Sequence, residues 1–152
     1  MDREARRNAF LYCKFRDEQY ALYDAYAKEN GILMNTFLVA NALFYAKEGM
    51  NQKNICQVTH QSKQTVSLIV KNLLREGYAC LEEDPQDKRN KIVKFTKEGW
   101  EYFRRPVRHI TQSEDRAMAL FTKEEQERLV QLSRKFTENL KKLVRGEETG
   151  EE

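Results

Sequence analysis

The stretch from Asn51 to Phe95 constrains the fold of this chain more than any other. It opens with a short helical segment, turns tightly at His60–Gln61, and continues into a longer helix that Ser62 is suited to cap. The longer helix carries apolar residues at the spacing of one buried helical face, namely Val66, Ile69, Val70 and Leu73. Gly77 follows directly and is expected to end this helix. Two helices joined this closely predict a helix-turn-helix, the motif whose second helix enters a DNA major groove.

The charge pattern of the same stretch favours DNA as the partner. The short helix has an apolar face at Ile55 and Val58, and the face of the longer helix opposite its core carries Gln64, Ser67, Leu68, Lys71 and Arg75. No Asp or Glu lies between Gly49 and Arg75, and none between Lys88 and Lys97, so both segments are positive. Solvated faces of ordinary helices would be the alternative. Two basic segments bracketing a helix-turn-helix favour DNA binding instead.

The flanking segments are predicted to be a hairpin and two further helices. Tyr78–Glu82 and Lys91–Phe95 are expected strands, and Asp84–Asp87 has turn chemistry. Helices are expected over residues 5–29 and 35–47, the second with Phe37, Ala40, Leu43 and Phe44 facing a core. The first helix is apolar on two neighbouring faces, which carry Leu11, Phe15, Leu22 and Tyr26, and Phe10, Cys13, Tyr20 and Ala27. A helix this apolar needs partners on several sides, which indicates a second subunit.

Two more helices are predicted after the hairpin. Thr96 caps the first, which carries Trp100, Phe103, Val107, Ile110 and Met118, and Pro106 is expected to kink or divide it. Thr122 and Glu125 form a capping box for the last helix. Its apolar stripe suits pairing with a symmetry mate and consists of Leu129, Leu132, Phe136, Leu140 and Leu143. The acidic residues 146–152 are expected to be a disordered tail.

Composition narrows the remaining function classes. The 152 residues suffice for one domain, and the net charge of +3 is weak. Three widely spaced cysteines form no disulfide framework, and there is neither a signal peptide nor a membrane-spanning run, so a cytoplasmic location is expected. Cys56 and His60 lie one helical turn apart but lack further ligands, so neither a metal site nor a cofactor is expected. With two distant histidines and no phosphate-binding or nucleophile motif, the chain is not expected to be an enzyme.

The segments SKQTVSLIVKNLLREG, from Ser62 to Gly77, and DPQDKRNKIVKFTKEG, from Asp84 to Gly99, resemble the MarR family of bacterial transcriptional regulators. The resemblance implies a mainly α fold with a small β-hairpin wing, a winged helix-turn-helix carried by N- and C-terminal dimerisation helices. It divides the chain into a dimerisation helix (1–34), a DNA-binding region (35–99), C-terminal dimerisation helices (100–145) and the tail (146–152). The expected activity is that of a homodimeric transcriptional regulator on a palindromic operator, whose half-sites are about one duplex turn apart. Repression is the expected outcome, with activation as the alternative.

The resemblance also assigns roles to individual residues. The expected DNA-binding residues are Ser62, Lys63, Gln64, Thr65, Ser67, Leu68, Lys71, Arg89 and Lys91. Gln64 is expected to pair with an adenine edge, and Ser62, Thr65 and Lys71 to hold phosphates. Arg89 resembles the family arginine that enters the minor groove, and Asp87 is expected to orient it through a salt bridge. An exposed wing ion pair without a DNA role is the alternative.

Two departures from the family pattern bear on affinity. Leu68 stands where an arginine is frequent, so it could pack on a thymine methyl but not hold a phosphate. Leu81, Glu82 and Glu83 occupy wing positions that are frequently basic, and the acids should weaken contact with the DNA backbone. A winged-helix scaffold that binds proteins instead of DNA is therefore a second hypothesis.

Two signals could control DNA binding, namely a small-molecule ligand or the oxidation of a cysteine thiol. Many relatives respond to aromatic or phenolic acids bound between the dimer helices and the DNA-binding lobe, where this chain has Tyr12, Tyr20, Tyr23, Phe44, Trp100 and Phe103. Aromatic residues on helices are also common in cores. Some relatives sense peroxide through a cysteine of the first helix, which Cys13 resembles, although a buried inert thiol is the ordinary alternative.

Overall fold

The computed structural model describes residues 2–146, so the expected tail at 147–152 lies outside the described part of the chain. Its order of elements is α1 (Arg3–Glu29), α2 (Met34–Tyr45), β1 (Met50–Asn51), α3 (Gln52–Thr59), α4 (Lys63–Arg75), β2 (Ala79–Glu83), β3 (Lys91–Phe95), α5 (Lys97–Ala119) and α6 (Lys123–Arg145). The chain divides after Ile110 into two compact units, and this boundary falls inside α5. None of the helices within residues 2–146 is both long and apolar enough to cross a membrane.

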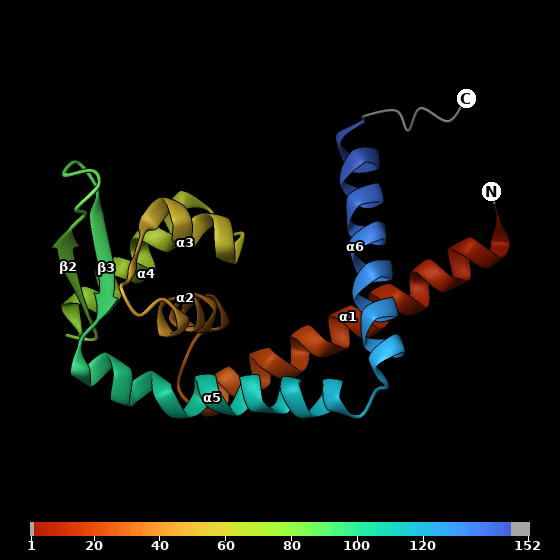
Figure 1. Ribbon diagram of the computed structural model, residues 1–152, viewed down its shortest axis with the longest axis horizontal. Coiled ribbons are helices and arrows are strands. Elements are labelled where there is room, and N and C mark those ends of the chain that lie inside the picture. The colour runs from red at the N-terminus through yellow and green to blue at the C-terminus, as the bar shows by residue number, and fades with distance from the viewer. Residues whose placement is uncertain (1, 147–152) are drawn as a thin grey trace. The chain divides into compact units, whose positions relative to one another are not determined.

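The core of the first unit lies between α2, α3, α4 and the start of α5. The predicted buried face of α4 is confirmed, because Val66, Ile69, Val70 and Leu73 are at most 6% exposed. The α2 residues Phe37, Ala40, Leu43 and Phe44 are buried as expected, and Val39 and Ala42 are buried as well. Since α2 is buried on nearly every side, it is the central helix against which α3 and α4 pack (Figure 1).

The short helix α3 corrects one expectation. Ile55 is fully buried and Cys56 packs against the core, but Val58 is 59% exposed. With only eight residues, α3 turns a single narrow face toward α2 and α4, and that face is centred on Ile55. Val58 lies outside it and belongs to the exposed surface.

The hairpin of β2 and β3 is confirmed, with β2 starting one residue later than predicted. It forms part of a three-stranded antiparallel sheet of order β1–β3–β2, in which Met50 pairs with Val93 and Asn51 with Ile92. The two-residue strand β1 was not predicted, because its pairing partner lies about 40 positions away and leaves no local pattern. Figure 1 shows the hairpin beside α3 and α4.

The start of α5 explains the Thr-x-x-Gly motif at residues 96–99. The Thr96 hydroxyl donates to the carbonyl of Gly77 at 2.6 Å and accepts from the Gly99 backbone N–H at 3.1 Å, so it joins the end of α4 to the start of α5. A Cβ at Gly99 would overlap the carbonyl of Tyr78. Only glycine allows the α5 backbone to approach the backbone of Tyr78, just before β2, so closely.

Pro106 does not divide α5. Lys97–Ala119 is one continuous helix with Pro106 buried inside it, so of the two expected effects, a kink or a division, the division is wrong. Phe103 and Val107 are buried beside it, Ile110 packs partly on the core, and Met118 is 36% exposed. Burial of the proline ring offsets part of the cost of the hydrogen bond that it cannot donate.

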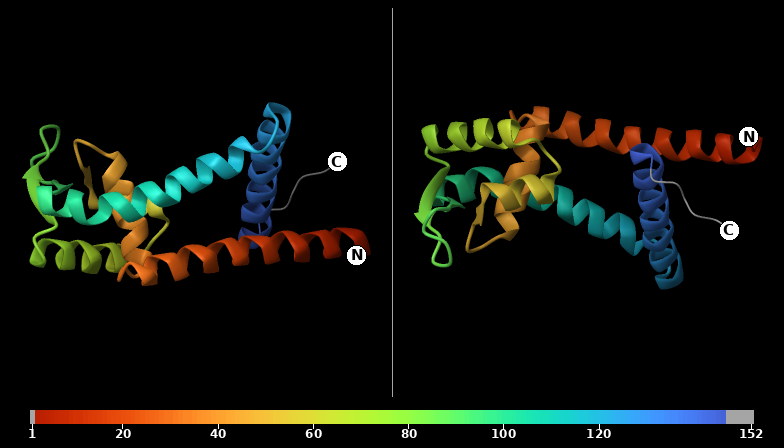
Figure 2. Two further views of the ribbon diagram at one scale, coloured as in Figure 1. Left: turned by 90° about the horizontal axis from the view of Figure 1, so that it is seen from below. Right: turned by 90° about the horizontal axis from the view of Figure 1, so that it is seen from above.

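Helices α1 and α6 expose most of their apolar residues. In α1 only Ala27 is buried, whereas Phe10, Phe15 and Leu22 are 58–69% exposed. Figure 2 shows the N-terminal half of α1 running away from the winged region. In α6, which Thr122 and Glu125 cap as predicted, no described residue is buried, and Leu129, Leu132, Leu140 and Leu143 are all at least 42% exposed.

Candidate nucleic-acid interface

Helix α4 is held at a defined position by its caps and its neighbours. The Ser62 hydroxyl oxygen accepts the Thr65 backbone N–H at 3.1 Å, and the Asn51 side chain caps α3 by accepting the Asn54 N–H at 2.8 Å. His60, at φ 54°, makes the tight turn between the two helices. The described residues therefore form the helix-turn-helix that the sequence predicted.

The outer face of α4 is polar, basic and free of acids. Lys63, Gln64, Ser67, Leu68 and Lys71 are all exposed. No carboxylate of the described residues pairs with Lys63 or Lys71, while Arg75 comes within 3.9 Å of Glu76. Two unpaired ammonium groups remain for phosphate contact.

The hydroxyls of Ser62 and Thr65 share one hydrogen bond of 2.9 Å. One of the two hydroxyls donates its proton in this bond, and the other only accepts, so the proton of the accepting hydroxyl is not used in the pair. One O–H at the start of α4 is therefore left to donate to an outside acceptor such as a phosphate oxygen.

The wing tip is ordered by its own side chains. The Asp84 carboxylate accepts the Gln86 N–H at 2.9 Å, and the Asp84 N–H donates to the carbonyl of Asn90 at 3.2 Å. Asp87 accepts the backbone N–H of Arg89 at 3.0 Å and the side-chain amide of Asn90 at 3.1 Å.

The expected salt bridge from Asp87 to the Arg89 guanidinium is not formed within residues 2–146. Asp87 shapes the turn through the backbone instead, because an Asp side chain two residues upstream of an N–H readily closes a local ring. Arg89 is exposed at the tip and its guanidinium stays available.

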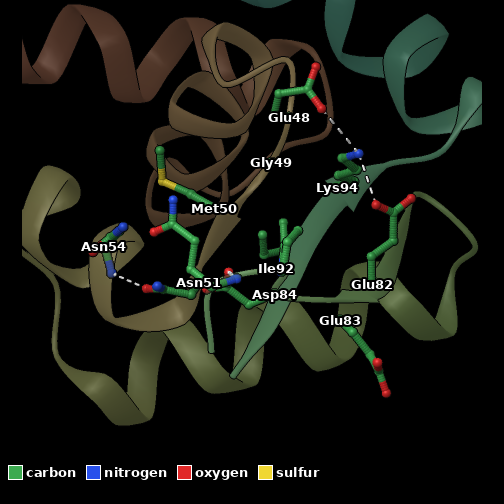
Figure 3. A pocket seen from close by; sticks show the side chains of 12 residues that line it. Glu48, Gly49, Met50, Asn51, Asn54, Glu82, Glu83, Asp84, Ile92 and Lys94 are labelled. Atoms are coloured by element: carbon green, nitrogen blue, oxygen red, sulfur yellow. Dashed lines mark hydrogen bonds and ion pairs between the residues drawn. The ribbon is translucent and has the colours of Figure 1, made fainter. Parts of the chain in front are cut away.

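Acids neutralise the two lysines in the body of the wing. The Lys94 ammonium lies 2.9 Å from Glu82 and 3.6 Å from Glu48 (Figure 3). Lys91 lies 3.5 Å from Glu83. The hydrogen bond that the Lys94 ammonium donates to the Glu82 carboxylate raises the pKa of Lys94 above its usual value. Lys91, an expected DNA contact, therefore meets a phosphate only in competition with Glu83.

A polar cavity of about 450 Å³ lies between β1, the first turn of α3 and the wing (Figure 3). Glu48, Glu82 and Lys94 form one side of it, and Asn51 and Asn54 approach from the start of α3. Through the pair with Glu48, Lys94 links the wing to the turn that follows α2. Sequence reasoning missed this link, because Glu48 and Lys94 are far apart along the chain.

The six aromatic residues expected around an effector do not share one cavity. Phe44 packs on Trp100 with ring centroids 4.3 Å apart, and Phe103 stacks on Phe95 at 5.2 Å, so these side chains build the core. Tyr23 packs partly against that core, and Tyr12 and Tyr20 are exposed.

Tyr20 lies instead beside a groove of about 410 Å³ between α1, the start of α2 and α4. Leu33, Thr65 and Leu68 also line this groove, so one of its walls belongs to the recognition helix α4.

The three cysteines are free thiols that are each partly buried. Residues 2–146 contain no group of three His, Cys, Asp or Glu side chains placed to hold a metal ion. Cys56 contributes to the core, as expected from its position on α3.

Comparison with known proteins identifies the class of this fold. Residues 31–90, which contain α2, α3, α4 and the wing as far as the residue before β3, match the model of the MarR family. The resemblance recognised in the sequence is thereby confirmed for the winged helix-turn-helix. No curated protein sequence matches the chain.

Solved structures extend the likeness in fold beyond that region. AbsC, a MarR family transcriptional regulator from Streptomyces coelicolor, is 19% identical with a TM-score of 0.76, over 93% of this chain and 97% of AbsC. MepR from Staphylococcus aureus in its DNA-binding conformation is 20% identical with a TM-score of 0.75, over 88% and 98%. MepR in its complex with DNA is 20% identical with a TM-score of 0.70, over 86% of this chain and 96% of MepR. The mainly helical winged fold predicted for the chain is that of MarR structures.

Proposed function

We propose that this chain is a transcriptional repressor of the MarR type that binds a palindromic operator as a homodimer. The outer face of α4 carries the proposal, because it presents unpaired lysines, hydrogen-bonding side chains and no acid. In each subunit α4 would enter the major groove while Arg89 at the wing tip reaches the minor groove. A relative of the same fold, MepR, has been solved in complex with DNA.

Exposed apolar residues support the homodimer. Phe10, Phe15 and Leu22 of α1 stay 58–69% exposed, and four leucines of the α6 stripe are at least 42% exposed, namely Leu129, Leu132, Leu140 and Leu143. Large apolar patches of this kind mark surfaces that another chain covers. A two-fold pairing through these helices would set two copies of α4 against one duplex, as a palindromic site requires.

A salt titration of DNA binding tests the proposal. The full chain is incubated with a duplex selected from a random pool, and affinity is measured by gel shift between about 50 and 200 mM salt. We expect a steep linear fall of log affinity with log salt, and competition by the selected palindrome but not by a scrambled duplex of equal length. Binding that ignores both salt and sequence would reject the repressor and favour the protein-binding scaffold.

The groove beside Tyr20 favours an effector as the signal. A phenolic acid bound there would contact Thr65 and Leu68 of α4, and so would change the surface that meets DNA. Release of the selected duplex by phenolic acids, abolished in Tyr20→Ala, would support this signal.

Peroxide sensing by Cys13 remains the second signal to test, since this thiol lies on the largely exposed helix α1. Release of DNA by peroxide in the wild type but not in Cys13→Ser would assign the signal to that thiol.

A further inference from the structure

Leu68 is an apolar side chain on an otherwise polar face. It is 60% exposed, although Val66, Ile69 and the other apolar residues on the inner face of α4 are almost fully buried. Gln64 and Lys71 are its exposed neighbours one helical turn before and after. The groove that Leu68 also lines leaves most of this side chain in contact with water.

The chemistry of leucine limits what Leu68 can recognise on a duplex. It has neither a donor nor an acceptor, so it makes no hydrogen bond to a phosphate or a base edge. The major-groove edges of the four base pairs display one distinctive apolar group, the 5-methyl of thymine. Leu68 and that methyl group would each lose contact with water when they meet, which favours their association.

We propose that Leu68 is a specificity-determining residue that selects thymine through its 5-methyl group. This inference rests on the proposed binding of DNA by α4. Gln64 lies four residues earlier on the same face, and its amide suits adenine. Together the two side chains favour adjacent A·T pairs in each half-site. Lys63 and Lys71, at either end of this face, contact DNA phosphates.

Replacing thymine by deoxyuridine tests this proposal, because the exchange removes only the methyl group and keeps Watson–Crick pairing. Each thymine of the selected duplex is exchanged in turn, and affinity for the full chain is measured at one salt concentration. We expect one thymine in each half-site to lose about fourfold in affinity when its methyl is removed. Leu68→Ala should bind both duplexes equally, at about the affinity of the wild type for the deoxyuridine duplex.

Val58→Ala is the matched control, because Val58 is an apolar side chain that is 59% exposed but lies outside the proposed reading surface, so this variant should keep the preference for thymine. Leu68 is exposed and alanine favours helix, so Leu68→Ala should fold, which circular dichroism checks. If wild type binds the selected duplex but tolerates deoxyuridine everywhere, or Leu68→Ala keeps the preference, the inference is wrong while DNA binding stands. If no duplex is selected, both are wrong.

Discussion

A single backbone position, Gly99, allows the start of α5 to pack against the residue that precedes β2. Gly99 lies in the first turn of α5, and a Cβ there would overlap the carbonyl of Tyr78. Helix propensity and tertiary packing therefore make opposite predictions for the same substitution.

Gly99→Ala is expected to destabilise the protein by about 1–3 kcal/mol, because the added methyl must displace the backbone of Tyr78. Helix propensity alone predicts a gain of up to about 1 kcal/mol. Chemical denaturation at one protein concentration measures the difference. Gly77→Ala is the control, since its Cβ would meet nothing within 4 Å and only its φ of 76° opposes a side chain. A Gly99→Ala protein as stable as wild type would refute the close approach.

The base-reading role of Gln64 is a second prediction at the scale of residues. Gln64→Ala should lower the preference at one A·T position of each half-site, by about 1–3 kcal/mol of discrimination, because the amide pairing with adenine is lost. Selection from random duplexes with wild type and variant measures that preference. Lys97→Ala, on the first turn of α5, serves as the control. An unchanged selected sequence would remove Gln64 from the reading surface.

Arg89 should act differently from Gln64. Arg89→Ala is expected to weaken binding and to relax the preference for A·T flanks, since a narrow minor groove attracts the guanidinium. Measuring affinity for duplexes with A·T or G·C flanks separates these effects. Lys88→Ala, the adjacent exposed cation, should weaken binding to both duplexes alike. Equal loss on both duplexes for Arg89→Ala would make it a phosphate contact only.

In the wing, the sequence did not predict which basic side chains are neutralised by ion pairs. Its acid-free strand β3 is basic, yet the neighbouring strand and the turn after α2 supply Glu82, Glu83 and Glu48 to its lysines. Cross-strand pairing brings these charges together, with Glu83 opposite Lys91 in the ladder. The wing consequently presents free cations mainly at its tip.

Neutralising the wing acids is expected to strengthen DNA binding. In the double variant Glu82→Gln, Glu83→Gln, Lys91 becomes available to phosphates and Lys94 keeps only its longer contact with Glu48, so the slope of log affinity against log salt should steepen by about 1–2. Gel shifts at several salt concentrations measure both quantities. Glu101→Gln is the control, because its partner Arg104 belongs to α5. Unchanged affinity and slope would place the body of the wing away from the duplex.

The exposed apolar helices matter at the scale of the whole molecule. A chain ending at Phe121 lacks α6 and is expected to be monomeric or aggregated, because the surface proposed to hold the two subunits is gone. Light scattering after size exclusion measures the mass of each form. Removal of residues 147–152 alone is the control and should leave a dimer. A well-behaved, DNA-competent dimer without α6 would overturn the proposed dimer surface.

Much of the winged helix-turn-helix could be predicted because its determinants are local. The caps Asn51 and Ser62 act within three residues, and the buried face of α4 repeats at a fixed helical spacing. The segments Ser62–Gly77, which contains α4, and Asp84–Gly99 also carried the family resemblance, and the match over residues 31–90 confirms that resemblance.

Only the tertiary structure decided how distant residues meet. The strand β1, the link from Lys94 to Glu48 and the approach of Gly99 to Tyr78 each join segments well separated along the chain. The exposure of Val58 and the continuity of α5 through Pro106 depend equally on which neighbours pack there. Local periodicity and capping specify a helix and its faces, whereas burial, strand pairing and ion pairs depend on the folding of the whole chain.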